Sequence, residues 1–212
     1  PGFSVDAMSS HVLCAIRRRL TWQSLGEALN EAAGHRSFWL LNAGFFVCGF
    51  QLVFIATHFP AYLDDHGLGL GVGASALALI GLFNIFGSYL FGLSGDFFRR
   101  KYVLSGIYLA RALITTIFLA LPLTPASALV FAAAMGFLWL GTVPLTSGLI
   151  GQIFGVRYLS TLYGIVFLSH QVGSFFGAWA AGFVYDRTGS YDAVWTGSLL
   201  LANPAALLHL SI

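Results

Sequence analysis

Residues 38–59 read FWLLNAGFFVCGFQLVFIATHF and contain no charged side chain. A helix needs about 20 mostly apolar residues to cross a hydrocarbon core roughly 30 Å thick. This stretch is therefore long enough to span a membrane, and Pro60 is expected to end it. Five further apolar runs follow along the chain. The predicted spans cover residues 38–59, 74–94, 102–121, about 126–150, about 159–185 and about 193–212.

Composition supports the same class of protein. Of 212 residues, 58% are hydrophobic and only 8% are charged, whereas soluble domains carry about 25% charged residues. These values argue against a soluble enzyme, a disordered chain and a nucleic-acid binder. The apolar runs lack the alternation of barrel strands, so we expect an all-α integral membrane protein. Cys14 and Cys48 fit neither a disulfide framework nor a metal site.

Lys and Arg positions indicate the orientation. One side of the predicted helices carries Arg187 and four aspartates, and the other side carries the greater share of the cations. Cytoplasmic loops are enriched in Lys and Arg, so we expect both chain ends in the cytoplasm and the protein in the plasma membrane. The residues on the expected cytoplasmic side are Arg17, Arg18, Arg19, Arg36, Arg99, Arg100, Lys101 and Arg157.

Residues 1–37 precede the first span and carry two helical signals. Ser24 and Glu27 have capping-box spacing, and Gly34 would end a short helix. We therefore expect a cytoplasmic segment over 1–37 and a transmembrane domain over 38–212. An interfacial amphipathic helix and a solvated basic loop both fit the earlier residues Val12, Leu13, Ile16 and Leu20 beside Arg17–Arg19.

A short motif occurs twice. Residues 87–92 read GSYLFG in the second span, and residues 173–177 read GSFFG in the fifth. The second span runs inward and the fifth outward, so we expect two inverted three-helix repeats, as in many transporters. Small residues at every fourth position predict close helix packing. They are Ser169, Gly173, Gly177 and Ala181 in the fifth span and Ala128, Ala132 and Gly136 in the fourth.

The turn between the second and third spans resembles a family signature. Residues 92–101 read GLSGDFFRRK, similar to the Gly-x-Leu-Ala-Asp-Arg-x-Gly-Arg-Lys signature of the major facilitator superfamily. Phe97 and Arg99 stand where that family has Arg and Gly. Residues 182–191 resemble the turn before its last helix. Residues 54–63 resemble the end of its seventh helix in the bacterial monocarboxylate and oxalate–formate branch. The matching signature residues are Gly92, Asp96, Arg100 and Lys101.

The resemblance implies that the chain is the carboxyl-terminal half, helices seven to twelve, of a twelve-helix transporter whose amino-terminal six-helix half is missing. It implies secondary active transport of a small organic anion, such as a monocarboxylate, by alternating access. A symporter or an antiporter fits, with proton coupling as one option. No phosphate-binding Gly-x-x-x-x-Gly-Lys loop is present, so we expect neither ATP coupling nor a cofactor.

The resemblance also implies roles for residues. The Asp96 and Arg100 group would latch one state at the cytoplasmic face, or simply anchor the loop. Arg111 lies near mid-bilayer, where a charge is costly. It would act as a substrate counter-ion or, as we favour, as a structural partner of a neighbouring helix. For each candidate substrate contact taken alone, we favour a bond between helices over a ligand contact. The candidates are Gln51, Asn84, Thr142, Thr146, His170, Gln171 and the outer His58.

Among these candidates His170 and Gln171 are favoured, and His170 is the candidate proton-sensing group. Asn84 and Ser88 occupy the positions where the monocarboxylate branch carries an Asp–Arg pair, so its charge-based coupling is not carried over. Two other classes stay open. One is a non-transporting six-helix membrane partner or self-assembling half-transporter. The other is a rhomboid-like intramembrane protease, based on Ser147-Gly148 and His170, although its first motif glycine is absent.

Overall fold

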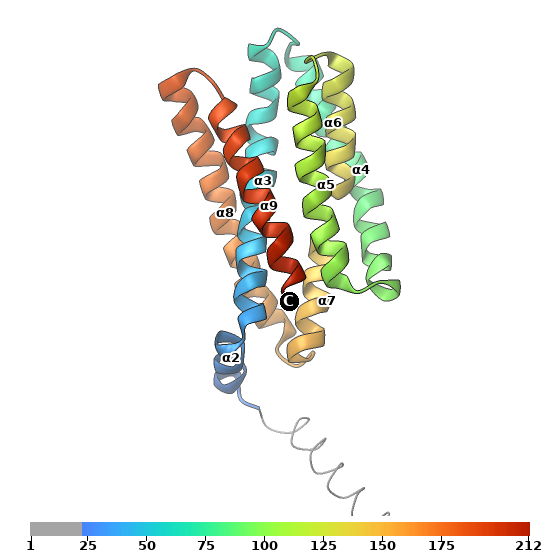
Figure 1. Cartoon of the computed structure of the whole chain (residues 1–212), viewed down its shortest axis with the longest axis vertical. Helices are drawn as coiled ribbons and strands as arrows, with labels where there is room; N and C mark the ends of the chain where they lie inside the picture. Colours follow the sequence, from blue (N-terminus) through green and yellow to red (C-terminus); the bar gives the residue numbers. More distant parts are fainter. Residues whose placement is uncertain (1–22) are drawn as a thin grey trace, which may run out of the picture.

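The computed structural model describes residues 23–212, and within this part of the chain every regular element is a helix. Figure 1 shows an elongated bundle with the short helix α2 at one end. The predicted amphipathic face around Arg17–Arg19 lies outside the described residues. The helices are α2 (Leu25–Gly34), α3 (Arg36–Asp65), α4 (Leu70–Phe97), α5 (Arg100–Ala120), α6 (Pro125–Leu138), α7 (Thr142–Phe154), α8 (Leu159–Thr188) and α9 (Asp192–Leu210).

Helix α2 forms as its cap predicts. The Ser24 side chain accepts a hydrogen bond from the Glu27 amide, and the Glu27 carboxylate accepts one from the Ser24 amide. Gly34 is the last helical residue. Ala28 and Ala32 are buried, and Ala32 belongs to a core cluster formed with residues of α3, α7 and α8. Helix α2 therefore packs against the end of the bundle.

Five stretches of the described chain are long and apolar enough to cross a membrane: α3, α4, α5, α6 together with α7, and α9. Helix α8 has 30 residues, as many as α3, yet it is not one of the five. Its middle carries His170 and Gln171, whose polarity lowers the mean hydropathy of the segment. The fifth span, predicted over residues 159–185, is thus a helix of sufficient length with a more polar composition.

The prediction that Pro60 ends the first span is wrong. Helix α3 continues through Pro60 to Asp65. Proline removes one helical hydrogen bond and needs room for its ring, and both demands can be met inside a helix bundle. Gly73 of α4 faces Pro60, and a Cβ atom at Gly73 would lie 2.9 Å from the Pro60 Cβ. The absence of a side chain at Gly73 leaves the space that the proline ring occupies.

The fourth span, predicted over about residues 126–150, is confirmed as a membrane-length stretch, but its regular helix is interrupted. Regular α-helix is interrupted between Leu138 and Thr142, which divides the segment into α6 and α7. Neither half alone has the roughly 20 residues of a spanning helix. Together they form one membrane-length stretch, residues 125–154, with a break near its middle.

Three helix pairs make the most extensive contacts: α3 with α8, α4 with α6, and α5 with α9. Two of these pairs depend on the glycines that begin the repeated motif, Gly87 and Gly173. At Gly173 of α8 a Cβ atom would clash with the Phe46 carbonyl of α3, and at Gly87 of α4 it would clash with the Phe137 carbonyl of α6. The repeated Gly-Ser motif therefore places a glycine at each of two helix crossings. Six of the seven residues in the predicted small-residue ladders are buried. They are Gly173, Gly177, Ala181, Ala128, Ala132 and Gly136.

Charged residues gather at the two ends of the bundle. Helices α3, α5 and α8 begin at the end that holds the cations, and α4, α7 and α9 end there (Figure 1). The opposite end carries Asp64, Asp65, Asp186 and Asp192 together with Arg187. The described cations at the first end are Arg36, Arg99, Arg100, Lys101 and Arg157.

Candidate functional site

The break between α6 and α7 is held by a buried arginine from α5. Arg111 is completely buried. Its Nη2 atom donates hydrogen bonds to the carbonyls of Leu138, at 2.7 Å, and Trp139, at 2.6 Å. The last carbonyls of a helix have no partner within the helix, and an unpaired carbonyl in a bilayer is costly. The guanidinium therefore supplies the hydrogen bonds that the end of α6 lacks.

An amide from α4 holds the other side of the break. The Asn84 Oδ1 atom accepts a hydrogen bond from the Leu140 backbone amide at 3.0 Å, and it accepts a second from the Ser88 hydroxyl at 3.0 Å. Arg111 thus donates hydrogen bonds to two carbonyls at the break, and Asn84 accepts a hydrogen bond from a backbone amide there. Because the two side chains belong to different helices, the break ties α4 and α5 to α6 and α7.

A line of polar contacts continues from Arg111 into the bundle. Its Nη1 atom donates to the Cys48 sulfur on α3 at 3.2 Å, and that sulfur lies 3.5 Å from the Thr142 hydroxyl at the start of α7. Arg111 also lies over the Tyr108 ring, whose hydroxyl donates to the Gly44 carbonyl at 2.7 Å. Four helices therefore meet around one cation.

The second polar group lies on α8. The His170 ring packs between Phe45 of α3 and Phe167. The distances between ring centroids are 5.4 Å to Phe45 and 5.5 Å to Phe167. Its Nδ1 atom lies 3.1 Å from the Gln171 side-chain oxygen and 3.3 Å from the Ser174 hydroxyl. His170 is mostly buried, whereas Gln171 is exposed on the helix. Although its side-chain oxygen contacts His170, Gln171 thus has exposed surface for a contact outside these helices.

The other predicted contacts lie apart from both groups. The Gln51 side-chain nitrogen donates to the Ser198 carbonyl of α9 at 3.1 Å, so this amide faces α9. Among the residues that the structure describes, the buried Gln51 Oε1 and Thr146 Oγ1 atoms have no hydrogen-bond partner. The sequence candidates therefore do not form a single cluster.

His58 links α3 to the second half of α8. Its Nε2 atom donates to the Ala178 carbonyl at 2.9 Å, which leaves Nδ1 of the neutral ring to accept from the Tyr191 hydroxyl at 3.2 Å. Burial, together with Asp65, raises the pKa of Tyr191. A tyrosine phenol is protonated at neutral pH in any case, and this shift extends to higher pH the range over which Tyr191 can donate the hydrogen bond.

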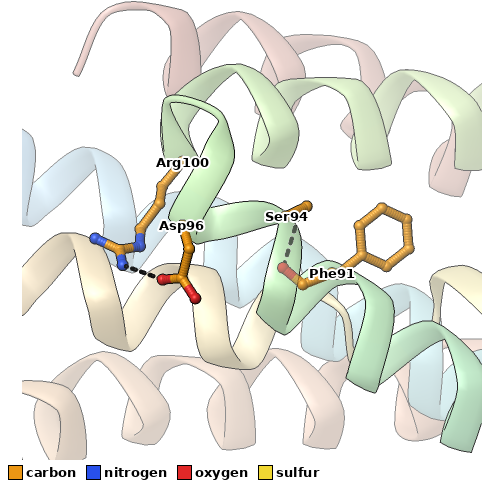
Figure 2. Close-up of polar contacts among 4 residues, drawn as sticks. All are labelled: Phe91, Ser94, Asp96 and Arg100. Carbon is orange, nitrogen blue, oxygen red and sulfur yellow. Dashed lines mark hydrogen bonds and ion pairs between the residues drawn. The ribbon is translucent and has the colours of Figure 1, made fainter.

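The signature at the α4–α5 turn forms an ion pair, which Figure 2 shows. Arg100 Nη2 lies 3.6 Å from the Asp96 carboxylate. Nearby, the Ser94 hydroxyl donates to the Phe91 carbonyl at 2.7 Å. The Asp96 side chain is 68% exposed and that of Arg100 is 20% exposed. This pair joins the end of α4 to the start of α5, and an exposed pair of this kind contributes little to stability.

The structure brings together three of the predicted residues, Arg111, Asn84 and Thr142, around the helix break. Sequence reasoning missed Cys48 and Ser174. A single thiol carries no pattern of its own, so Cys48 had no detectable signal. Ser174, in contrast, belongs to the repeated Gly-Ser motif, and that motif could have indicated it.

Long apolar helices, a broken helix near mid-membrane and a polar network around the break define a multi-pass membrane protein of the transporter class. Comparison with known families agrees with this class. Residues 9–178 match the Major Facilitator Superfamily, and the chain belongs to that family. Since its members are membrane transporters, the protease alternative built on Ser147 is not supported.

Two curated relatives from Rattus norvegicus are similar to this chain. Monocarboxylate transporter 13 is 28% identical over 176 residues, which cover 81% of this chain and 39% of the relative. Monocarboxylate transporter 12 is 29% identical over 166 residues, which cover 74% of this chain and 34% of the relative. The chain thus spans between a third and two fifths of the length of these relatives.

Proposed function

We propose that this chain is the carboxyl-terminal half of a secondary active transporter that moves a small organic anion, such as a monocarboxylate, by alternating access. In this proposal α3 to α9 provide six membrane spans, and both chain ends face the cytoplasm at the plasma membrane. A second six-helix half completes the substrate cavity. The names of the two relatives support the substrate class.

The pairing of the helices is the observation that carries the proposal. An inverted repeat would exchange α3 with α6–α7, α4 with α8, and α5 with α9. This exchange turns the α3–α8 pair into the α6–α4 pair and leaves the α5–α9 pair unchanged, and these are the three most extensive pairs. It also relates Gly87 to Gly173, and each faces a backbone carbonyl of its partner helix. Both features support two inverted three-helix units.

The geometry favours different roles for the candidate residues. Arg111 and Asn84 are committed to the helix break, so we assign them to holding α6 and α7. His170 and the exposed Gln171 remain as substrate contacts on α8, with Thr142 and Thr146 on α7 as secondary candidates. Because imidazole titrates near neutral pH in general, His170 is also the group that we propose for proton coupling.

The signature at the α4–α5 turn would act as a latch. Asp96 and Arg100 join two helices of the same half through one ion pair. A carboxylate at the membrane edge can exchange charge-assisted partners when helices rock apart. Gly92 and Lys101 flank this pair and complete the proposed motif.

The test is uptake by the full-length transporter in proteoliposomes, with labelled lactate as the first probe. His170→Ala is expected to raise KM for the anion about tenfold or more, since a hydrogen bond to a charged group contributes about 1.5–3 kcal/mol. Insertion and expression should be retained. His66→Ala is the matched control and should leave KM unchanged. His66 directly follows the last residue of α3, and its ring contacts the Tyr62 carbonyl.

Two results would contradict these assignments. Normal uptake by both His170→Ala and Gln171→Ala would remove α8 from the proposed substrate site. A transport rate that stays constant from about pH 5 to 8 would remove His170 as the proton-sensing group. Saturable uptake by the 212-residue chain alone would instead favour a self-assembling half-transporter.

A further inference from the structure

A pocket of about 250 Å³ lies at the cationic end of the bundle, between the start of α5 and the end of α7. One part of its lining is cationic and polar, with Gln152 beside three consecutive basic residues. The other part is apolar. The lining residues are Arg99, Arg100, Lys101, Leu149, Gln152, Ile153 and Ile212.

The positive charge of this pocket is poorly neutralised by the described residues. Asp96 is the one carboxylate that pairs with Arg100 there, at 3.6 Å and with 68% of its side chain exposed. Arg100 itself is largely withdrawn from water, and it packs close to Gly148 of α7. The Lys101 ammonium donates to the Leu210 carbonyl at 3.5 Å, a long hydrogen bond to a neutral group. Among the described side chains, Asp96 is therefore the one carboxylate in an ion pair with these three cations.

Local structure does not account for this arrangement. Cations at the beginning of a helix oppose its dipole, and the first turn of α5 carries no acidic side chain. Membrane topology favours cations at this end, but it does not require them to converge. Arg157 lies at the same end and satisfies the topological preference without lining the pocket. The convergence of Arg99, Arg100 and Lys101 on one pocket points to an anionic ligand.

We propose that this pocket binds the phosphate headgroup of an anionic phospholipid from the adjoining leaflet. The three cations would hold the phosphate, as clusters of Lys and Arg beside membrane helices commonly do. The apolar wall formed by Leu149 and Ile153 would contact the glycerol and the first methylenes of the lipid. Free phosphate shares the charge but has no group for that wall. This proposal does not depend on the transported substrate.

The test uses the 212-residue chain purified in detergent and presented with phosphatidylglycerol or phosphatidylcholine, with bound lipid measured by native mass spectrometry. Phosphatidylglycerol is expected to be retained preferentially. The double variant Arg99→Gln with Lys101→Gln should weaken its binding about thirtyfold, which corresponds to about 2 kcal/mol. Circular dichroism establishes that the variant is folded. Arg157→Gln is the matched control and should bind as the unmodified chain does.

Each remaining outcome contradicts the proposal. Equal retention of the two lipids would show that charge is not recognised. Equal losses in the double variant and in Arg157→Gln would show a general surface effect instead of a pocket. Displacement of the lipid by millimolar inorganic phosphate would assign the pocket to a free anion. Uptake measurements are not involved, so this result is independent of the proposed transport function.

Discussion

Replacement of Arg111 by Lys gives the sharpest test of the helix break. The substitution keeps the positive charge but removes the planar fork that donates to the Leu138 and Trp139 carbonyls. Interhelical hydrogen bonds in membranes are worth about 0.6 kcal/mol on average and about 1.7 at most. The loss of two such bonds predicts a decrease of about 1–3 kcal/mol in the free energy of unfolding.

Arg111→Met distinguishes the contribution of the Arg111 hydrogen bonds to stability from that of its charge. It loses the same hydrogen bonds, but it also removes a cation whose placement in mid-membrane costs about 2.5–3.5 kcal/mol on insertion scales. We therefore expect Arg111→Met to be less destabilising than Arg111→Lys. A substrate counter-ion predicts the opposite preference in function, because Lys would preserve a charge contact that Met abolishes.

The assay is unfolding of the purified chain in mixed micelles, combined with hydrogen exchange of backbone amides in residues 136–146. Faster exchange there in Arg111→Lys is expected, because the break loses its partners. Arg187→Lys is the matched control. Arg187 lies over the Phe183 ring near the end of α8, away from the helix break. Unchanged stability and exchange in Arg111→Lys would refute the structural role, above all if Arg111→Gln abolished substrate binding in a well-expressed full transporter.

Three further predictions address the packing and the topology. Gly173→Val and Gly87→Val should each prevent close helix contact and reduce the yield of folded protein. The same change at Gly164 should be tolerated, because nothing lies within 4 Å of an added Cβ there. Equal yields of the three variants would refute this prediction. Asn84→Ala should lower the unfolding free energy by about 1 kcal/mol, since it leaves the half-buried Leu140 amide unpaired, and an unchanged value in mixed micelles would argue against its role. Cysteines at Asp65 and Asp192 should be labelled from outside and one at Lys101 from inside; labelling from the opposite sides would reverse the proposed orientation.

Much of the fold could be predicted from local sequence. Hydropathy located most helix ends to within about four residues, apart from the end of α3 and the α6–α7 break, because each apolar run must form its own backbone hydrogen bonds in lipid. The small-residue ladders also identified helix faces that pack closely. These signals lie within each helix, so a single sequence contains them.

The interruptions could not be predicted in the same way. The break after Leu138 is stabilised by Arg111 and Asn84, which lie 27 residues from Leu138 and 56 residues from Leu140 respectively. Pro60 looked like a helix end, but Gly73 on another helix makes room for it. In both cases the deciding partner is distant in sequence. For the same reason the sequence did not show which site candidates lie together, since no local feature indicates that Asn84 faces a helix break.

The central claim is that this chain supplies one half of a transporter, and reconstitution of the halves tests it most directly. The measurement is uptake of labelled lactate into proteoliposomes containing the 212-residue chain, the second half, both together, or the intact transporter. We predict saturable uptake by the intact transporter and by the two halves together, with none by this chain alone. Saturable uptake by this chain alone, or none by an intact transporter shown to be folded, would contradict the account.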